Sequence, residues 1–299
     1  MPESDITNLV LGNCLSAAIY PTTYVKVLIQ IGYEPCPPQP GTSFFGKPIL
    51  VLPGFIGYSS HVYQRGGFGK LYDGVFPHLI HKNLTKFAED GMTRRLADAD
   101  DDAKEPDVDV KDFLISTAKQ TVAKCAAVTI AHPFHVIFVR TAAQFVGGEC
   151  MYHSLWSSIS HIFKNEGLSG FFSGLVPSLL YESLVLVSTN AMIFVFNSVY
   201  TDKNDEFAHW PPFLFNMVAT SVFYPFTVVA NCMAVTDSGL AIGQPNYMPR
   251  FRGWMQCWRW LSSRNELKRG SGIWFSRRYL GPQAIIGGCA VPIECQLAS

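Results

Sequence analysis

The sequence carries little charge. Lysine, arginine, aspartate and glutamate make up 15% of the 299 residues, whereas a soluble globular chain has roughly 25%. The formal net charge is zero, which argues against general nucleic-acid binding. Hydrophobic residues account for 48% of the chain. This composition indicates an integral membrane protein with polar parts.

The chain also lacks the short motifs of enzymes and metal sites. Its eight histidines form no HExxH or H-x-x-x-H pattern, and neither a G-x-S-x-G turn nor a GK[ST] phosphate loop occurs. The eight cysteines include no C-x-x-C pair, and five of them lie in or beside apolar segments, as small core residues do. We therefore expect no enzymatic activity, no cofactor and no metal site.

Several segments approach the ~20 apolar residues that cross a bilayer. The start, Met1–Asp5, is acidic, so neither a cleaved signal nor a matrix presequence is expected. A further candidate, Val75–Ala88, is interrupted by polar side chains. Four membrane spans are predicted: Ile6–Ile31, Phe113–Val146, Leu175–Tyr200 and Phe213–Val235.

One pattern of proline and glycine occurs three times. Pro21, Pro133 and Pro225 each lie inside a long apolar stretch, 112 and 92 residues apart. A module of about a hundred residues has therefore been triplicated. Two of the stretches lead to a glycine-bounded aromatic tag, whereas the third tag has decayed near Trp274–Arg277. The two intact tags are Gly67-x-x-x-Leu71-Tyr72-Asp73-Gly74 and Gly167-x-x-x-Phe171-Phe172-Ser173-Gly174.

Each module is predicted to contain a helix, a loop with a surface helix, and a second helix. Repeat 1 covers residues 1–97, repeat 2 covers 113–204, and a degenerate repeat 3 covers 205–299. Residues 98–112 are rich in aspartate and form a solvated linker, with an acidic docking tail as the alternative. In repeat 3, an apolar stripe surrounded by arginines suits the lipid headgroup layer, or else a helix packed under the bundle. The interfacial residues proposed there are Trp254, Trp258 and Arg259.

These repeats resemble the mitochondrial carrier family, whose modules carry P-x-[DE]-x-x-[KR]-x-[KR] and, later, [DE]-G with an aromatic tag. More specifically, the chain resembles the divergent mitochondrial carrier homolog branch. The resemblance implies an all-α membrane protein with three helical hairpins around a pseudo-threefold axis. The segments that carry it are spread over all three modules: Tyr24–Gln30, Gly32–Pro35, His132–Ile137, Gly174–Pro177, Tyr224–Phe226 and Gly239–Ala241.

The charges of the carrier signature are lost. At the acid positions of the three modules stand Thr23, His135 and Thr227, so the ion pairs that close one end of a carrier cannot form. The base positions hold Lys26, Phe138 and Ala230. The stretches Phe87–Gly91 and Phe196–Tyr200 do not supply the opposite gate either. Since alternating access depends on two gates, we expect no transport cycle.

The last helix of a carrier is also missing. Only 24 residues follow Phe275, and they include Gly281-Pro282, Gly287-Gly288 and Pro292. Proline and paired glycine at this density oppose a spanning helix. We therefore predict a bundle whose sixth helix is missing or degenerate, so that one wall opens sideways into lipid.

Polar residues stranded in apolar helices are the candidate lining of a hydrophilic groove. Lys26 and Glu182 are isolated charges in predicted spans, where a functional role is the default hypothesis. The alternatives are a structural Lys26–Glu182 pair or snorkelling to the interface. Arg140 stands at a retained basic position of the signature, with headgroup contact as its alternative. The full candidate set is Lys26, Glu182, Arg140, His78, His81, Lys82, Tyr224 and Asn231, and the repeat signature adds Pro21, Pro133, Pro225, Gly74 and Gly174.

The resemblance implies the mitochondrial outer membrane and insertion of tail-anchored and other α-helical client proteins. It also implies lipid scrambling and recruitment of a pro-apoptotic partner. Two other hypotheses compete with it. The chain could be a docking platform without activity of its own, or a degenerate solute carrier of the inner membrane. A platform should tolerate changes at Lys26 and Glu182, which distinguishes it from an insertase.

Overall fold

The computed structural model describes residues 3–42, 46–98, 110–199, 211–245, 247–272, 277–279, 281, 283–286 and 289–292. Helices dominate it, which confirms the predicted all-α class, and the predicted spans match long helices to within a few residues. The α-helices are α1 (Glu3–Gln30), α2 (Phe55–Gly66), α3 (Val75–Asp98), α4 (Val110–Gly147), α5 (Leu155–Glu166), α6 (Leu175–Val199), α7 (Pro211–Val235) and α8 (Trp254–Ser263).

Three segments are long and apolar enough to cross a membrane. They are Val110–Gly147, Leu155–Ser198 and Pro212–Val235, which correspond to α4, α6 and α7. Among the described residues, α1 does not meet the same criterion, although the sequence predicted a span at Ile6–Ile31. Apolar side chains stay exposed along these helices, among them Val122, Val187 and Val222. An apolar exterior of this kind is what a lipid environment requires.

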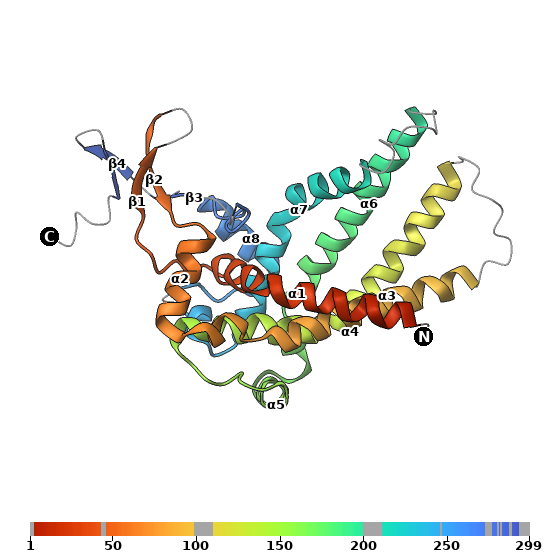
Figure 1. Ribbon diagram of the computed structural model, residues 1–299, viewed down its shortest axis with the longest axis horizontal. Coiled ribbons are helices and arrows are strands. Elements are labelled where there is room, and N and C mark those ends of the chain that lie inside the picture. Colours follow the sequence, from red (N-terminus) through yellow and green to blue (C-terminus); the bar gives the residue numbers. More distant parts are fainter. Residues whose placement is uncertain are drawn as a thin grey trace.

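The helices follow the predicted order within each module. A long helix (α1, α4 or α7) leads to a short surface helix (α2, α5 or α8), and in the first two modules a second long helix follows (α3 or α6) (Figure 1). Short 3-10 turns, η1 (Phe68–Tyr72) and η2 (Gly167–Phe172), join the surface helix to the second long helix. A third, η4 (Ala241–Gly243), follows α7. The modules are therefore structural repeats as well as sequence repeats.

The three signature prolines lie inside the first helix of each module. Pro21 is in α1, Pro133 in α4 and Pro225 in α7. A proline removes one backbone hydrogen bond and bends the helix around it. Figure 1 shows α4 and α7 each bending partway along their length.

The residue before each proline binds the backbone just before a tag glycine. Tyr20 Oη donates to the carbonyl of Asp73 (2.5 Å), and His132 Nε2 donates to the carbonyl of Ser173 (3.1 Å). In the third module, Tyr224 Oη donates to the carbonyl of Arg269 (3.0 Å). The next residue is a glycine with positive φ in every case: Gly74 (82°), Gly174 (80°) and Gly270 (80°).

These glycines also pack against the first helix of the next module. A Cβ on Gly174 would lie 2.5 Å from the carbonyl oxygen of Ala230 in α7. A Cβ on Gly74 would lie 3.3 Å from Thr141 in α4, and one on Gly270 would lie 3.4 Å from Gln30 in α1. The three contacts close a ring, because the third module returns to the first.

The ring revises the sequence interpretation of the third tag. Leu267 precedes Gly270 by three residues, as Leu71 precedes Gly74 and Phe171 precedes Gly174. The end of the third tag is therefore Gly270. The decayed tag predicted near Trp274 falls on residues 274–276, which lie outside the described residues.

A small sheet adds strands that the sequence did not predict. The turn-rich stretch after α1 continues into β1 (Gln39–Thr42) and β2 (Pro48–Leu52), which pair antiparallel with Gln39 opposite Val51. The C-terminal region adds β3 (Arg277–Arg278) beside β2 and a hairpin of β4 (Gln283–Ile286) and β5 (Cys289–Pro292). In the part of the chain that the structure describes, no α-helix follows Ser263, as predicted for the missing last helix.

Replacement of Gly174 by alanine tests the ring of glycines. We expect the G174A variant to lose roughly 2 kcal/mol or more of stability, because a left-handed residue with a side chain costs about 1–2 kcal/mol before any clash. The matched control is G91A, at a glycine within α3 whose added Cβ would meet no atom within 4 Å. Thermal unfolding in detergent should show a lower midpoint for G174A only, and equal midpoints would contradict the role of the ring.

Candidate functional site

Neutral side chains join the three bent helices near the C-terminal end of α1. Gln30 Nε2 donates to Tyr224 Oη (2.9 Å), and Asn231 Nδ2 donates to Gln30 Oε1 (2.7 Å). His135 Nε2 donates to Asn231 Oδ1 (3.0 Å). Gln30 Nε2 also lies 3.4 Å from Thr227 Oγ1. We call these five residues the closing network; it connects α1, α4 and α7.

The closing network includes two of the positions where a carrier places its gate acids. His135 and Thr227 stand at acid positions of the signature, and both take part in hydrogen bonds rather than ion pairs. Gln30 and Asn231 are almost fully buried. A buried polar group is stable only when its hydrogen bonds are satisfied. The side chains of the closing network therefore join the helices through hydrogen bonds, and Arg269 adds a charged contact there, since its Nε donates to the backbone carbonyl of Gln30 (2.6 Å).

Lys26 lies one turn before Gln30 on α1. Its ammonium group is 5.1 Å from the ring centroid of Tyr224, a cation–π distance. Its neighbours Val25 and Val27 are buried, whereas Lys26 is half-buried. Among the described residues no carboxylate lies within ion-pair distance of it. Lys26 is thus a charge held beside an aromatic ring.

Glu182 belongs to a charged cluster formed by three helices. Lys124 of α4 lies 2.8 Å from Glu89 of α3 and 3.8 Å from Glu182 of α6. Their side chains are 22% to 35% exposed. We call these three residues the charged cluster. The Lys26–Glu182 pair considered from the sequence is not formed, because Glu182 faces Lys124 instead.

Histidines gather between α3 and α4. The His78 ring lies 4.9 Å from Phe138 and 5.4 Å from Tyr20. His81 is hydrogen-bonded to the carbonyl of Ala131 (3.1 Å), and its ring centroid is 5.2 Å from that of His135. These two predicted residues therefore line the packed faces of the helices. Lys82 is exposed and donates instead to the hydroxyl of Ser16 in α1.

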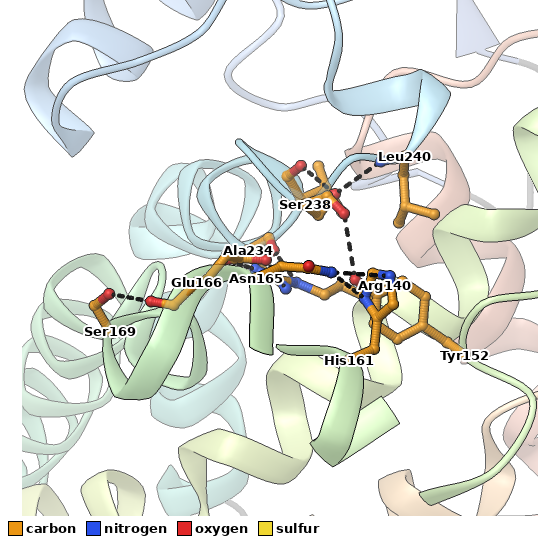
Figure 2. A network of polar contacts seen from close by, with 10 residues as sticks. Arg140, Tyr152, His161, Asn165, Glu166, Ser169, Ala234, Ser238 and Leu240 are labelled. Carbon is orange, nitrogen blue, oxygen red and sulfur yellow. Dashed lines mark hydrogen bonds and ion pairs between the residues drawn. The ribbon is translucent and has the colours of Figure 1, made fainter. Parts of the chain in front are cut away.

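Arg140, which the sequence assigned to the groove, has a buried ion-pair partner. Its side chain is fully buried and binds Glu166 through both guanidinium ends, at 2.5 and 2.7 Å (Figure 2). Its Nε also donates to the carbonyl of Ala234 at the end of α7 (2.9 Å). A bidentate pair of this geometry is among the strongest polar contacts. The sequence placed Arg140 in the groove, whereas the structure places its side chain in a buried ion pair with Glu166 of the [DE]-G motif and against the end of α7.

Tyr152 belongs to the same network, as Figure 2 shows. Its hydroxyl donates to the carbonyl of Ser238 (3.3 Å), and its backbone N–H donates to Gln144 Oε1 (2.9 Å). Burial raises the pKa of Tyr152, which keeps the hydroxyl protonated and able to donate. Residues after α4 and after α7 are thereby tied together under the bundle.

The proposed interfacial tryptophans contact α7. Trp254 and Trp258 are half-buried and place their rings 6.4 and 4.8 Å from Phe226. Arg259 is exposed on the same helix. The two tryptophans thus have the contacts of a helix packed under the bundle, while the arginine stays available to solvent or headgroups.

Some residues of the site were missed from the sequence. Lys124 and Glu89 form the charged cluster, and Gln30 is at the centre of the closing network. Lys124 could have been found with the criterion that selected Lys26, since it also stands inside a predicted span. Nothing in the sequence pairs Glu89 with Lys124, because their proximity depends on the packing of α3 on α4.

Known proteins resemble this chain over most of its length. The family model described as "Mitochondrial carrier protein" matches residues 111–203. Mitochondrial carrier homolog 2 of Homo sapiens is 34% identical over 91% of this chain and 93% of its own length. Mitochondrial carrier homolog 1 of Mus musculus is 33% identical over 92% of this chain and 77% of its own length.

A repeated helical bundle with bent first helices and tag glycines defines a carrier-like membrane protein. At this identity and coverage, the chain belongs to the mitochondrial carrier homolog family. It is accordingly a mitochondrial membrane protein with several apolar helices.

The Arg140–Glu166 pair makes a prediction about stability. We expect E166A to lose roughly 3–5 kcal/mol, because it leaves a buried guanidinium without its counter-ion. The control is R250A, which removes an ion pair with Asp237 whose side chains are 70% and 58% exposed. Surface pairs contribute about 0–1 kcal/mol. Chemical unfolding in detergent should separate the two variants clearly; a similar small loss in both would refute the structural role of Arg140.

A double-mutant cycle tests the closing network. We expect Q30L and N231L each to cost about 1–3 kcal/mol, since each leaves a buried polar partner unsatisfied. Because the two side chains bond each other, the double variant should lose less than the sum, with a coupling of about 0.5–3 kcal/mol. Q64L, at an exposed glutamine bonded to Ser60, is the control and should be nearly silent. Strict additivity would show that the two amides act separately.

Proposed function

We propose that this protein is an insertase of the mitochondrial outer membrane for tail-anchored and other α-helical proteins. The observation that carries the proposal is a set of charged and polar side chains inside a bundle with an apolar exterior. These are Lys26, the charged cluster and the histidines between α3 and α4. The outer-membrane location and the recruitment of a pro-apoptotic protein rest on the family resemblance.

A client with a tail anchor must move a short hydrophilic end through the bilayer. A charged side chain at mid-membrane costs ~2.5–3.5 kcal/mol on insertion scales. Polar side chains along the path offer the hydrophilic end hydrogen bonds and counter-charges in place of the water that it leaves behind. The barrier falls without nucleotide hydrolysis or covalent chemistry. The same path would let lipid headgroups move between the leaflets.

We place the lateral opening between α1 and α7, where a carrier has its sixth helix. Gln30 provides the hydrogen bonds between these two helices, near the C-terminal end of α1. Toward their N-terminal ends both helices expose apolar side chains, as lipid-facing surfaces do. These include Leu11 and Leu15 in α1 and Phe213, Met217 and Val222 in α7. Lys26 lies beside this opening, over the ring of Tyr224.

A solute-transport cycle fits the chain less well. Carriers close each end with ion pairs that must break and form again. Here Gln30, Tyr224 and Asn231 of the closing network are buried, and its side chains meet through hydrogen bonds. Hydrogen bonds between buried amides are costly to open unless other groups replace them. A bundle closed permanently at one end suits lateral entry from lipid better than alternating access.

Reconstitution into liposomes tests the proposal. Insertion of a tail-anchored client should occur with the wild-type protein and should change roughly fivefold or more in K26E, E182R and K124E. A change of about 1 kcal/mol in a barrier produces that factor. The matched control is K164E, which reverses an exposed lysine on α5, outside the long apolar helices. Lipid scrambling should be measured in the same vesicles.

The outcomes distinguish the functions. Insertion that responds to the three interior charges but not to K164E supports the insertase. Scrambling that responds while insertion never appears would assign the path to lipids alone. If neither activity responds in folded variants, the insertase proposal fails and the protein is better described as a docking platform.

A further inference from the structure

A pocket between α4 and α6 lies at the end of the bundle remote from the closing network. It is an open groove rather than a closed cavity, and its volume is about 220 Å³. Phe113 lies close to the first residue of α4 and Asn197 close to the last residue of α6, and both line it. The rings of Phe113 and Phe194 stack at 4.4 Å beside it.

The pocket is lined by uncharged polar side chains. Asn190 Nδ2 donates to Gln120 Oε1 across it (3.0 Å). This bond leaves the Gln120 NH₂ group and the Asn190 carbonyl oxygen without a protein partner among the described residues. Thr117 is 7% exposed, and its hydroxyl has no hydrogen-bond partner there either. The accessible donors and acceptors of the pocket are therefore the side-chain amides of Gln120 and Asn190, whereas the Thr117 hydroxyl is shielded from the surface. The remaining polar lining residues are Ser116 and Asn197.

Side-chain amides match peptide groups in their hydrogen bonding. Asn and Gln each present one acceptor and two donors, as the backbone of an extended chain presents alternating C=O and N–H groups. The twelve residues from Phe113 to Lys124 span roughly 16 Å of helix. An extended peptide covers that distance with about five residues. The pocket and the helix below it therefore have the length and chemistry for a short stretch of polypeptide.

The charged cluster lies directly below the pocket. Lys124 is one turn beyond Gln120 on α4, and Glu182 is two turns before Asn190 on α6. Two carboxylates face one ammonium group there, so the cluster has a net negative charge. The negative charge of the cluster favours a neutral or basic peptide over an acidic tail.

We infer that the α4–α6 pocket binds the hydrophilic end of the client as an extended, uncharged or basic peptide. This inference rests on the proposed insertase function and names the part of the client that the bundle recognises first. The side-chain amides of the pocket bind the peptide groups of the tail, so the pocket accepts tails of many sequences. Tails rich in aspartate and glutamate bind less well.

Site-specific photo-cross-linking tests the inference in vesicles that contain the full-length protein. A photoreactive phenylalanine derivative replaces Ile193, which lines the pocket, or Val187, which is 43% exposed on α6 and does not line it. The client is a tail-anchored protein with a Ser/Asn-rich tail, and matched clients carry lysines or glutamates in the tail. We expect the neutral and basic tails to cross-link at position 193 and not at 187, with the acidic tail clearly weaker.

A pair of substitutions tests the role of the amides. The Q120L/N190L variant should cross-link less at position 193, by roughly fivefold for each net hydrogen bond lost. The matched control is N13L/N83L, which removes an amide pair of the same length (3.0 Å) between α1 and α3. The thermal unfolding midpoints of both variants are measured, and cross-linking is compared at a temperature at which both are folded. A folding defect is then not mistaken for lost binding.

The results separate this inference from the proposed function. Equal cross-linking at 187 and 193, or cross-linking that Q120L/N190L leaves unchanged, overturns the pocket. Normal insertion without any tail cross-link at 193 also overturns the pocket but keeps the insertase. Cross-linked tails without insertion support the pocket and refute the insertase. Cross-links to phospholipid in place of the tail would identify a lipid site and overturn the inference.

Discussion

Gln30 hydrogen-bonds to two side chains of α7 with opposite ends of one amide. Its NH₂ group binds Tyr224, its oxygen accepts from Asn231, and Asn231 in turn accepts from His135 of α4. An amide can serve as donor and acceptor at once without charge, so one residue joins three proline-bent helices where a carrier uses ion pairs. Two charged side chains are arranged around this junction, because Arg269 donates to the backbone carbonyl of Gln30 and Lys26 lies over the Tyr224 ring.

The ring of tag glycines supplies the frame around that network. Tyr20, His132 and Tyr224 each hold the carbonyl before a glycine, and each glycine packs on the first helix of the next module. The third module completes the ring through Gly270, before the region where a sixth helix would stand. The pseudo-threefold frame is thereby independent of the last helix. A carrier-like bundle can lose that helix and still keep its closed end.

The polar side chains of the bundle differ in charge from one end to the other. Uncharged amides and hydroxyls line the α4–α6 pocket, the charged cluster lies below it, and histidines lead to the neutral closing network. A hydrophilic chain moving along this path would exchange water for hydrogen bonds and then for counter-charges. Under the proposed function, no step would need an external energy source, because each transfer replaces one set of polar contacts with another. The groups expected from the sequence and those found only in the structure act together in this arrangement.

Local sequence determined the helices, their bends and the absence of the gate ion pairs. Apolar length sets α4, α6 and α7, proline bends a helix wherever it stands, and a threonine or histidine at an acid position cannot form a carboxylate pair. Tertiary structure alone decided which partner each polar side chain has. Arg140 belongs to Glu166 rather than to a groove, Glu182 faces Lys124 rather than Lys26, and the third tag ends at Gly270. The physical reason is distance along the chain: these contacts join residues on different helices, and only packing brings such residues within hydrogen-bonding range.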